Sequence, residues 1–206
     1  VRELLLAEGR LSESGPVLFY AALKMEPERL AARTSRAFLG VRMECAQCHD
    51  HFFDKRWKQT DFWGYAAFFA QISRPQGKME EVSPVLRVLD TNRGEVSLPE
   101  SENVINPRFP LGSPALASVD GPSRRQQLAD WLTQEHNPQF ARATANRIWA
   151  HLFGRGIVDP VDDMRPDNSP VCPDVLEALA KSLVATRYDL RTLIRGIVLS
   201  DAWQRS

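Results

Sequence analysis

Residues 137–154, which read NPQFARATANRIWAHLFG, decide the fold of this chain. Asn137 is a favoured residue at a helix N-cap, Pro138 suits the first helical position, and Gly154 suits the position just past the last turn. Between these ends the apolar residues recur at helical spacing: Ala141, Ala145, Ile148, Trp149 and Leu152. The stretch therefore predicts an amphipathic helix whose beginning and end are both marked in the sequence.

Helical patterns continue on both sides of this stretch. Leu128, Trp131 and Leu132 mark a helix before it. After it, one helix follows Pro173 and another is capped by Asp189, and each carries an apolar stripe. Four amphipathic helices with short connections can close a small bundle, so the sequence predicts a helical domain over residues 122–206.

The loop that precedes Pro173 is acidic. Its carboxylates could bind a hard cation, but the spacing of a calcium-binding loop is absent. Aspartate beside proline and glycine is common in turns, and we interpret the loop in that way. Cys172, at the end of the loop, is interpreted as a lone buried or cap-region thiol.

Residues 76–121 have a different character, because prolines and glycines are scattered through them. This composition is typical of a linker or an irregular subdomain. Within it, residues 85–89 and 95–98 flank a loop that ends in Gly94, which predicts a small β-hairpin.

The first part of the chain, residues 1–75, is again helical in pattern. Residues 27–44 carry the stripe Leu30, Thr34, Ala37, Phe38 and Val41. A second helix, capped by Thr60, carries Phe62, Trp63, Tyr65, Ala66, Phe68 and Phe69. It is apolar on nearly every side, so it lies in an aromatic core or shields a flat apolar group, and the core is the simpler interpretation. The predicted fold class is mainly α: a helical segment around a CxxCH motif, an irregular linker with a small hairpin, and a C-terminal helical bundle.

Between those two helices lies CAQCH, residues 45–49, and Cys-x-x-Cys-His is the spacing that attaches a c-type haem. The thiols of Cys45 and Cys48 would add across the vinyl groups of the haem, and His49 would bind the iron from one face. The sequence therefore predicts haem c as cofactor, with Cys45 and Cys48 as covalent anchors and His49 as proximal ligand, and electron transfer as function. The sixth ligand stays unassigned, because Met164 or His151 would need the C-terminal part to fold over the site.

The same segment allows other sites. A thioredoxin-like redox pair needs its cysteines beside a βαβ pattern, whereas the flanking sequence here is helical. Zinc or non-haem iron is the stronger alternative, since His49, His51 and Asp54 offer imidazole and carboxylate donors within a few residues. Such a centre would suit a metal-dependent enzyme. A non-catalytic binding module of an exported assembly is the third hypothesis.

The composition limits the partners. Lysine and arginine number 26, aspartate and glutamate also 26, so no overall field draws the chain to nucleic acid or an anionic membrane. No apolar run approaches the ~20 residues that cross a bilayer. The chain begins at Val1 without a leader, so we expect a fragment or a processed product of a larger protein. The oligomeric state is not predicted.

Two parts of the sequence resemble known families. Residues 36–51, RAFLGVRMECAQCHDH, continue to Trp57 and Phe69 and resemble the planctomycete cytochrome-associated domain of unknown function. Residues 146–156, NRIWAHLFGRG, with VDDMRP at 161–166, resemble its companion C-terminal domain.

The resemblance implies a place in large exported proteins, which often carry a separate cytochrome c-like domain. It therefore implies a periplasmic or cell-surface location and, as partners, a redox protein or other domains of the parent protein. The family pattern has proline where this chain has Phe53, and histidine where it has Cys172.

Overall fold

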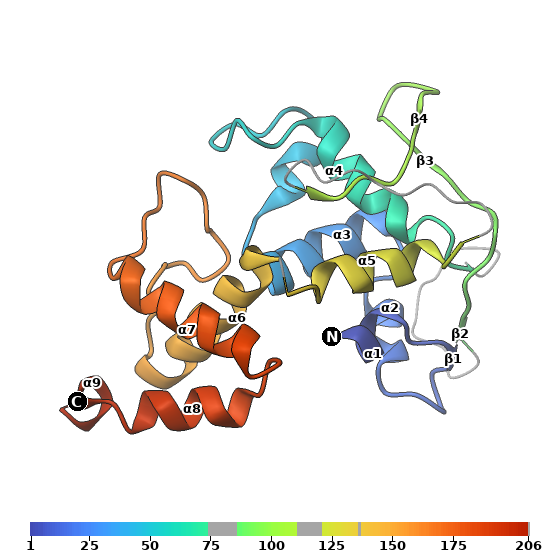
Figure 1. Cartoon of the computed structure of the whole chain (residues 1–206). Coiled ribbons are helices and arrows are strands. Elements are labelled where there is room, and N and C mark those ends of the chain that lie inside the picture. Colours follow the sequence, from blue (N-terminus) through green and yellow to red (C-terminus); the bar gives the residue numbers. More distant parts are fainter. Residues whose placement is uncertain (74–85, 111–120, 136, 206) are drawn as a thin grey trace. The chain divides into compact units, whose positions relative to one another are not determined.

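The computed structural model describes residues 1–73, 86–110, 121–135 and 137–205 (Figure 1). Its residues divide into two compact units, and each is described by itself. Unit 1 comprises Val1–Arg33 and Met43–Thr133, and unit 2 comprises Thr34–Arg42 and Gln134–Ser206. The predicted mainly α fold class is confirmed.

Unit 1 is built from short helices around an aromatic core. The helices are α1 (Arg2–Leu5), α2 (Val17–Ala22), α3 (Pro27–Thr34), a 3-10 helix (Met43–Gln47), α4 (Gln59–Ala66), a 3-10 turn (Ala67–Phe69) and α5 (Arg124–Leu132). The aromatic rings of α4 and its extension are buried to within 1% exposure at Phe62, Tyr65, Phe68 and Phe69. Phe109 stacks between Phe68 and Trp131 at centroid distances of 4.7 and 5.2 Å. The rings of Phe62, Tyr65, Phe68 and Phe69 therefore lie in an aromatic core, which is the simpler of the two interpretations of this helix.

Two helix boundaries differ from the prediction. The helix expected over residues 27–44 continues from α3 into a π-helical turn (Ser35–Leu39) and ends at Gly40, whose φ of 64° is left-handed. Helix α4 is capped by Lys58 rather than Thr60, because the Asp61 carboxylate accepts a hydrogen bond from the Lys58 backbone N–H.

The strands of unit 1 are two residues long, and the small hairpin expected in the linker is present but does not pair residues 85–89 with 95–98. Strand β2 (Arg87–Val88) pairs with β1 (Gly9–Arg10), and β3 (Val96–Ser97) pairs with β4 (Val104–Ile105), both antiparallel. The loop between β2 and β3 packs on residues 70–73. The Ser73 backbone N–H donates to Leu89 O, and the Thr91 backbone N–H donates to Gln71 O. Gly94 is needed there, because a Cβ at this position would lie 2.2 Å from Ala70 O. Residues 76–85 and 111–120 of the predicted linker lie outside the described residues.

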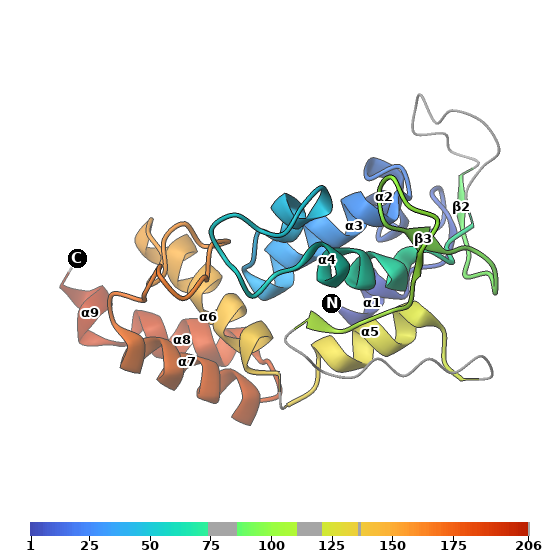
Figure 2. The ribbon, with the colours of Figure 1, turned by 90° about the horizontal axis from the view of Figure 1, so that it is seen from above.

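Unit 2 contains α6 (Pro138–Phe153), α7 (Pro173–Ala185), α8 (Leu190–Val198) and α9 (Asp201–Gln204). Helices α6, α7 and α8 contact one another, as Figures 1 and 2 show. Their core comprises Ala145, Ile157, Val158, Leu176, Leu183, Leu193 and Ile197. The predicted caps are confirmed: Asn137 accepts from the Phe140 N–H, Asp189 accepts from the Arg191 N–H, and Gly154 is left-handed with φ 76°.

The division of the chain differs from the boundaries expected at residues 75 and 121. Helix α5 contacts α1 and the 3-10 turn Ala67–Phe69, so it belongs to unit 1 rather than to the predicted C-terminal bundle. The segment Thr34–Arg42, expected in the first domain, belongs to unit 2. Unit 2 thus contains a segment that lies far from the rest of it in the sequence, and this segment interrupts unit 1. Within the described residues, no helix is long and apolar enough to span a membrane.

Candidate functional site: the CxxCH segment and its supports

The CxxCH segment, residues 45–49, lies on the 3-10 helix Met43–Gln47 and the turn that follows. A 3-10 helix has about three residues per turn, so residues three apart share a face. Met43 and Ala46 are fully buried, whereas Cys45 and Cys48 are exposed and unbridged. The 3-10 helix therefore places an apolar face on the core, while Cys45, within it, and Cys48, just past its end, are exposed to solvent.

Helix α4 holds this segment in place. The indole N–H of Trp63 donates to Gln47 O at 2.9 Å, and the Gln59 side-chain amide donates to the same oxygen at 3.2 Å. The Asp50 carboxylate accepts from the Gln59 backbone N–H at 3.0 Å and from Lys58 Nζ at 2.9 Å. The hydrogen bond from Lys58 lowers the pKa of Asp50 below its ordinary value. The segment is thus fastened to the first turn of α4, where carboxylates are favoured.

His49 is exposed, and its ring has a defined hydrogen bond. Its Nδ1 lies 2.7 Å from the main-chain oxygen of Asp50. A carbonyl oxygen only accepts hydrogen bonds, so the contact requires the proton on Nδ1. In the neutral ring this leaves the lone pair on Nε2, the nitrogen that can bind a metal.

His51 and Asp54 are buried and have structural contacts. Nδ1 of the His51 ring accepts from the backbone N–H groups of Phe53 at 3.2 Å and Asp54 at 2.9 Å. The backbone N–H of His51 donates to Trp57 O. The Asp54 carboxylate accepts from Arg56 Nε at 2.9 Å and Nη2 at 2.7 Å. Burial raises the pKa of Asp54, but hydrogen bonds and the charge of Arg56 outweigh it and hold the pKa below its ordinary value.

The structure does not bring His49, His51 and Asp54 together as ligands. Across residues 1–73, 86–110, 121–135 and 137–205, no three His, Cys, Asp or Glu side chains form a group that could hold a metal ion. The contacts of His51 and Asp54 instead define the loop that follows the CxxCH segment. The zinc or non-haem iron alternative gains no support from this geometry.

The acidic loop of unit 2 pairs its carboxylates with arginines. Asp162 accepts from Arg42 Nη2 at 2.6 Å and lies 3.6 Å from Arg36 Nη1. Burial raises the pKa of Asp162, but the hydrogen bonds and charge of Arg42 outweigh it, so its pKa lies below the ordinary value. The other three carboxylates also face arginines: Asp159 faces Arg155, and Asp163 and Asp167 face Arg165. The loop is therefore a set of ion-paired turns, as expected.

The candidate sixth ligands and Cys172 all belong to unit 2. The Met164 N–H donates to Gly40 O at 2.8 Å, and a Cβ at Gly40 would lie 3.0 Å from Met164 Sδ. Gln139 Nε2 is 3.7 Å from the same sulfur. His151 is exposed on α6, and Cys172 is exposed at the N-cap of α7. Met164 thus packs within its own unit, and the lone thiol is a cap residue rather than a buried one.

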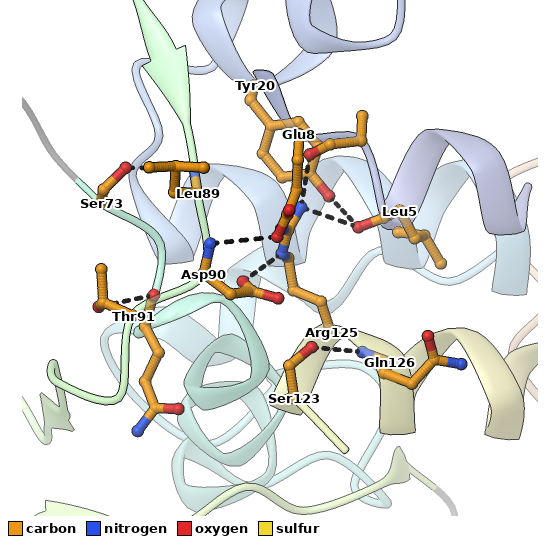
Figure 3. Close-up of polar contacts among 12 residues, drawn as sticks. Leu5, Glu8, Tyr20, Ser73, Leu89, Asp90, Thr91, Ser123, Arg125 and Gln126 are labelled. Carbon is orange, nitrogen blue, oxygen red and sulfur yellow. Dashed lines mark hydrogen bonds and ion pairs between the residues drawn. The ribbon is translucent and has the colours of Figure 1, made fainter.

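A buried arginine in unit 1 is a feature that sequence reasoning missed. Figure 3 shows Arg125 extending from α5 to Asp90, Glu8 and the carbonyl of Leu5. Its side chain is 1% exposed, and it also donates to Ala7 O at 2.9 Å. Its guanidinium lies 5.2 Å from the Tyr20 ring, and burial raises the pKa of Tyr20. Every polar contact of Arg125 is with its own unit, so we assign it a structural role.

The supports of the CxxCH segment were also missed, namely Asp50, Gln59 and Trp63. The sequence gives little sign of these contacts. Asp50 lies nine residues before Gln59, the first residue of α4, and nothing in that spacing predicts that it will contact the helix. Only the fold of the intervening loop brings them together.

Comparisons with known proteins match two families. Residues 6–74 match the model PSCyt2, described as a protein of unknown function (DUF1549). Residues 124–206 match the model PSD1, described as a protein of unknown function (DUF1553). No curated protein and no solved structure matches the chain. The resemblance stated from the motifs is confirmed, in the same order along the chain.

The matched ranges do not coincide with the compact units. Thr34–Arg42 lies within the first match but belongs to unit 2, and α5 lies within the second match but belongs to unit 1.

Proposed function

We propose that this chain, which carries the PSCyt2 and PSD1 domains in that order, binds a c-type haem at residues 45–49 and takes part in electron transfer. Cys45 and Cys48 are the covalent anchors, and His49 is the proximal ligand. The name of the first family points to a cytochrome-related role, and the site residues supply the finer assignment.

The observation that carries the proposal is the hydrogen bond of His49. An axial histidine of a metal site usually donates from its other ring nitrogen to a carbonyl or a carboxylate, which fixes the tautomer. Here the Nδ1 contact with Asp50 O, at 2.7 Å, leaves Nε2 for the iron. The thiols of Cys45 and Cys48 are exposed and unbridged, as thioether formation requires. The residues present therefore fit the group.

The chain's own residues would position and orient the haem. When bound, the haem supplies an iron that accepts and releases one electron. Trp63 and Gln59 hold the main chain of Gln47 between the two cysteines, so the spacing of the thiols is set before attachment. Asp50 connects His49 to the first turn of α4 through Lys58 and Gln59, which restrains the imidazole.

The proposal includes a location outside the cytoplasm, because thioether attachment of haem takes place there in bacteria. Its partners would be a redox protein or other domains of the parent protein.

The test is expression of the chain together with a c-type maturation system. We expect a product that keeps its haem through acid-acetone extraction and denaturation, because thioether bonds survive both. Replacing Cys45 and Cys48 together with alanine should abolish retained haem, whereas Cys172→Ala, which removes the other exposed thiol, should not. Haem that is absent from the unaltered chain, or that extracts freely, would contradict covalent attachment.

The role of His49 needs a separate variant. His49→Ala should change the spin state seen in the absorption spectrum while leaving the thioether-bound haem in place. His136→Ala, which removes a histidine that is not a candidate ligand, is the control. An unchanged spectrum for His49→Ala would show that another residue binds the iron.

A further inference from the structure

Two phenyl rings lie exposed directly after the CxxCH segment. Phe52 is 67% exposed and Phe53 is 65% exposed, and their ring centroids are 5.1 Å apart at an interplanar angle of 81°. In the described part of the chain, the other exposed large apolar side chains are aliphatic. Exposed phenyl side chains leave the favourable free energy of burial unrealised, so a pair of them indicates a surface with a partner.

The loop that carries Phe52 and Phe53 is held in place by hydrogen bonds. The Phe53 and Asp54 backbone N–H groups donate to the buried imidazole of His51, and the Trp57 N–H donates to Asp54 O. Asp54, 4% exposed, is held by Arg56. The loop has a buried polar base, and the rings are presented on its outer side.

Lys55 gives this surface a positive charge. Its Nζ lies 5.4 Å from the centroid of the Phe52 ring, a cation–π distance. Within the described residues, the neighbouring cations Arg56 and Lys58 are paired with Asp54 and Asp50, whereas Lys55 makes no ion pair. The surface therefore combines two apolar rings with one cation that is available to an anionic group.

We propose that Phe52, Phe53 and Lys55 are the outer part of the haem-binding site. The occupant is the haem that the proposed function places on Cys45 and Cys48, and this inference rests on that function. A haem presents an apolar macrocycle and two propionate carboxylates. Phe52 and Phe53 cover apolar surface of the ring, and Lys55 pairs with a propionate. The continuity of this surface with the thiols along the chain, and the match of both apolar and charged groups, favour haem over a protein partner.

The test uses the full chain matured with haem and a double variant, Phe52→Ser with Phe53→Ser. We expect covalent haem to be retained, because the cysteines are intact. The reduction potential should fall, since a wetter surrounding favours the more highly charged ferric state, and small exogenous ligands should bind the iron faster. The control is Leu18→Ser with Val104→Ser, which removes two apolar side chains of similar exposure elsewhere in unit 1.

Three further variants complete the test. Phe52→Leu with Phe53→Leu keeps the surface apolar and should preserve the potential, and circular dichroism checks that every variant folds. Lys55→Gln should lower the potential, and Lys55→Arg should restore it, because the charge near the propionate is returned.

The outcomes separate this inference from the function on which it rests. If the unaltered chain carries no covalent haem, both fail together. If it carries haem but the serine variant and its control have the same potential and the same rate of ligand binding, the haem-covering role is overturned and the proposed function stands. A serine variant that changes only the rate of electron exchange with another protein would make the rings a docking surface, which also overturns the inference.

Discussion

Replacing Arg125 with methionine should destabilise unit 1 by about 3 kcal/mol. Methionine keeps most of the apolar stem but removes the donors to Asp90, Leu5 O and Ala7 O. Breaking a buried ion pair by removing one partner costs roughly 3–5 kcal/mol, because the other charge is left desolvated. Asp90 is 21% exposed and Glu8 50% exposed, so water relieves part of the loss, and the lower end of that range applies.

Hydrogen exchange of peptides from α5 and α1, read by mass spectrometry, measures this loss where it occurs. About 3 kcal/mol corresponds to a rate increase of roughly a hundredfold for amides that exchange through unfolding of the unit. The control is Arg2→Met, which breaks an ion pair with Asp130 that is 47% and 44% exposed, and it should cost at most ~1 kcal/mol. If Arg125→Met costs no more than Arg2→Met, the buried contacts of Arg125 do not supply this stability and the argument is wrong. If exchange changes only in α6–α8, α5 is not part of unit 1, which refutes the argument as well.

Three further predictions concern unit 2. Because the pKa of Asp162 is lower in the folded chain than its ordinary value, the stability that Asp162 contributes is present above the unfolded pKa of about 3.9 and is lost as pH falls through the folded pKa. In urea unfolding between about pH 5 and 2, Asp162→Asn should therefore lose less stability on acidification than the unaltered chain does. The control Asp167→Asn, at a side chain that is 65% exposed, should lose as much as the unaltered chain. If the two variants show the same dependence of stability on pH, the prediction is refuted. Gly40→Ala should cost more stability than Gly154→Ala, since both positions have positive φ but only Gly40 has Met164 and Val161 within 3.3 Å of the new Cβ, and thermal melts that rank them equally would contradict the packing at Gly40. A shortened chain of residues 121–206 should show faster amide exchange in α6 than the full chain, because it lacks the turn Ser35–Leu39 that contacts α6; equal protection would show that this segment adds no stability.

Much of the candidate site was predictable, because its chemistry is local. Cys45, Cys48 and His49 are proposed as site residues from their spacing alone, and both thiols are exposed at the 3-10 helix Met43–Gln47 and the turn that follows it. The roles of His51 and Asp54 were not predictable in this way. Both residue types are good metal ligands, and only the buried contacts with Arg56 and the loop backbone show that these two define a loop instead.

The sequence by itself determined the mainly α fold class, the caps at Asn137, Asp189 and Gly154, and the resemblance to the two families whose models match parts of the chain. These features depend on interactions that span a few residues, so they can be read directly from spacing and residue type. Tertiary structure alone decided the pairing of the two-residue strands, which are too short to carry a periodic pattern, and the contacts of Arg125 with residues near the N-terminus. It also decided that Arg42 pairs with Asp162, across 120 positions, within unit 2. Such long-range ion pairs form where tertiary packing brings opposite charges side by side, and no local rule states which distant partner that will be.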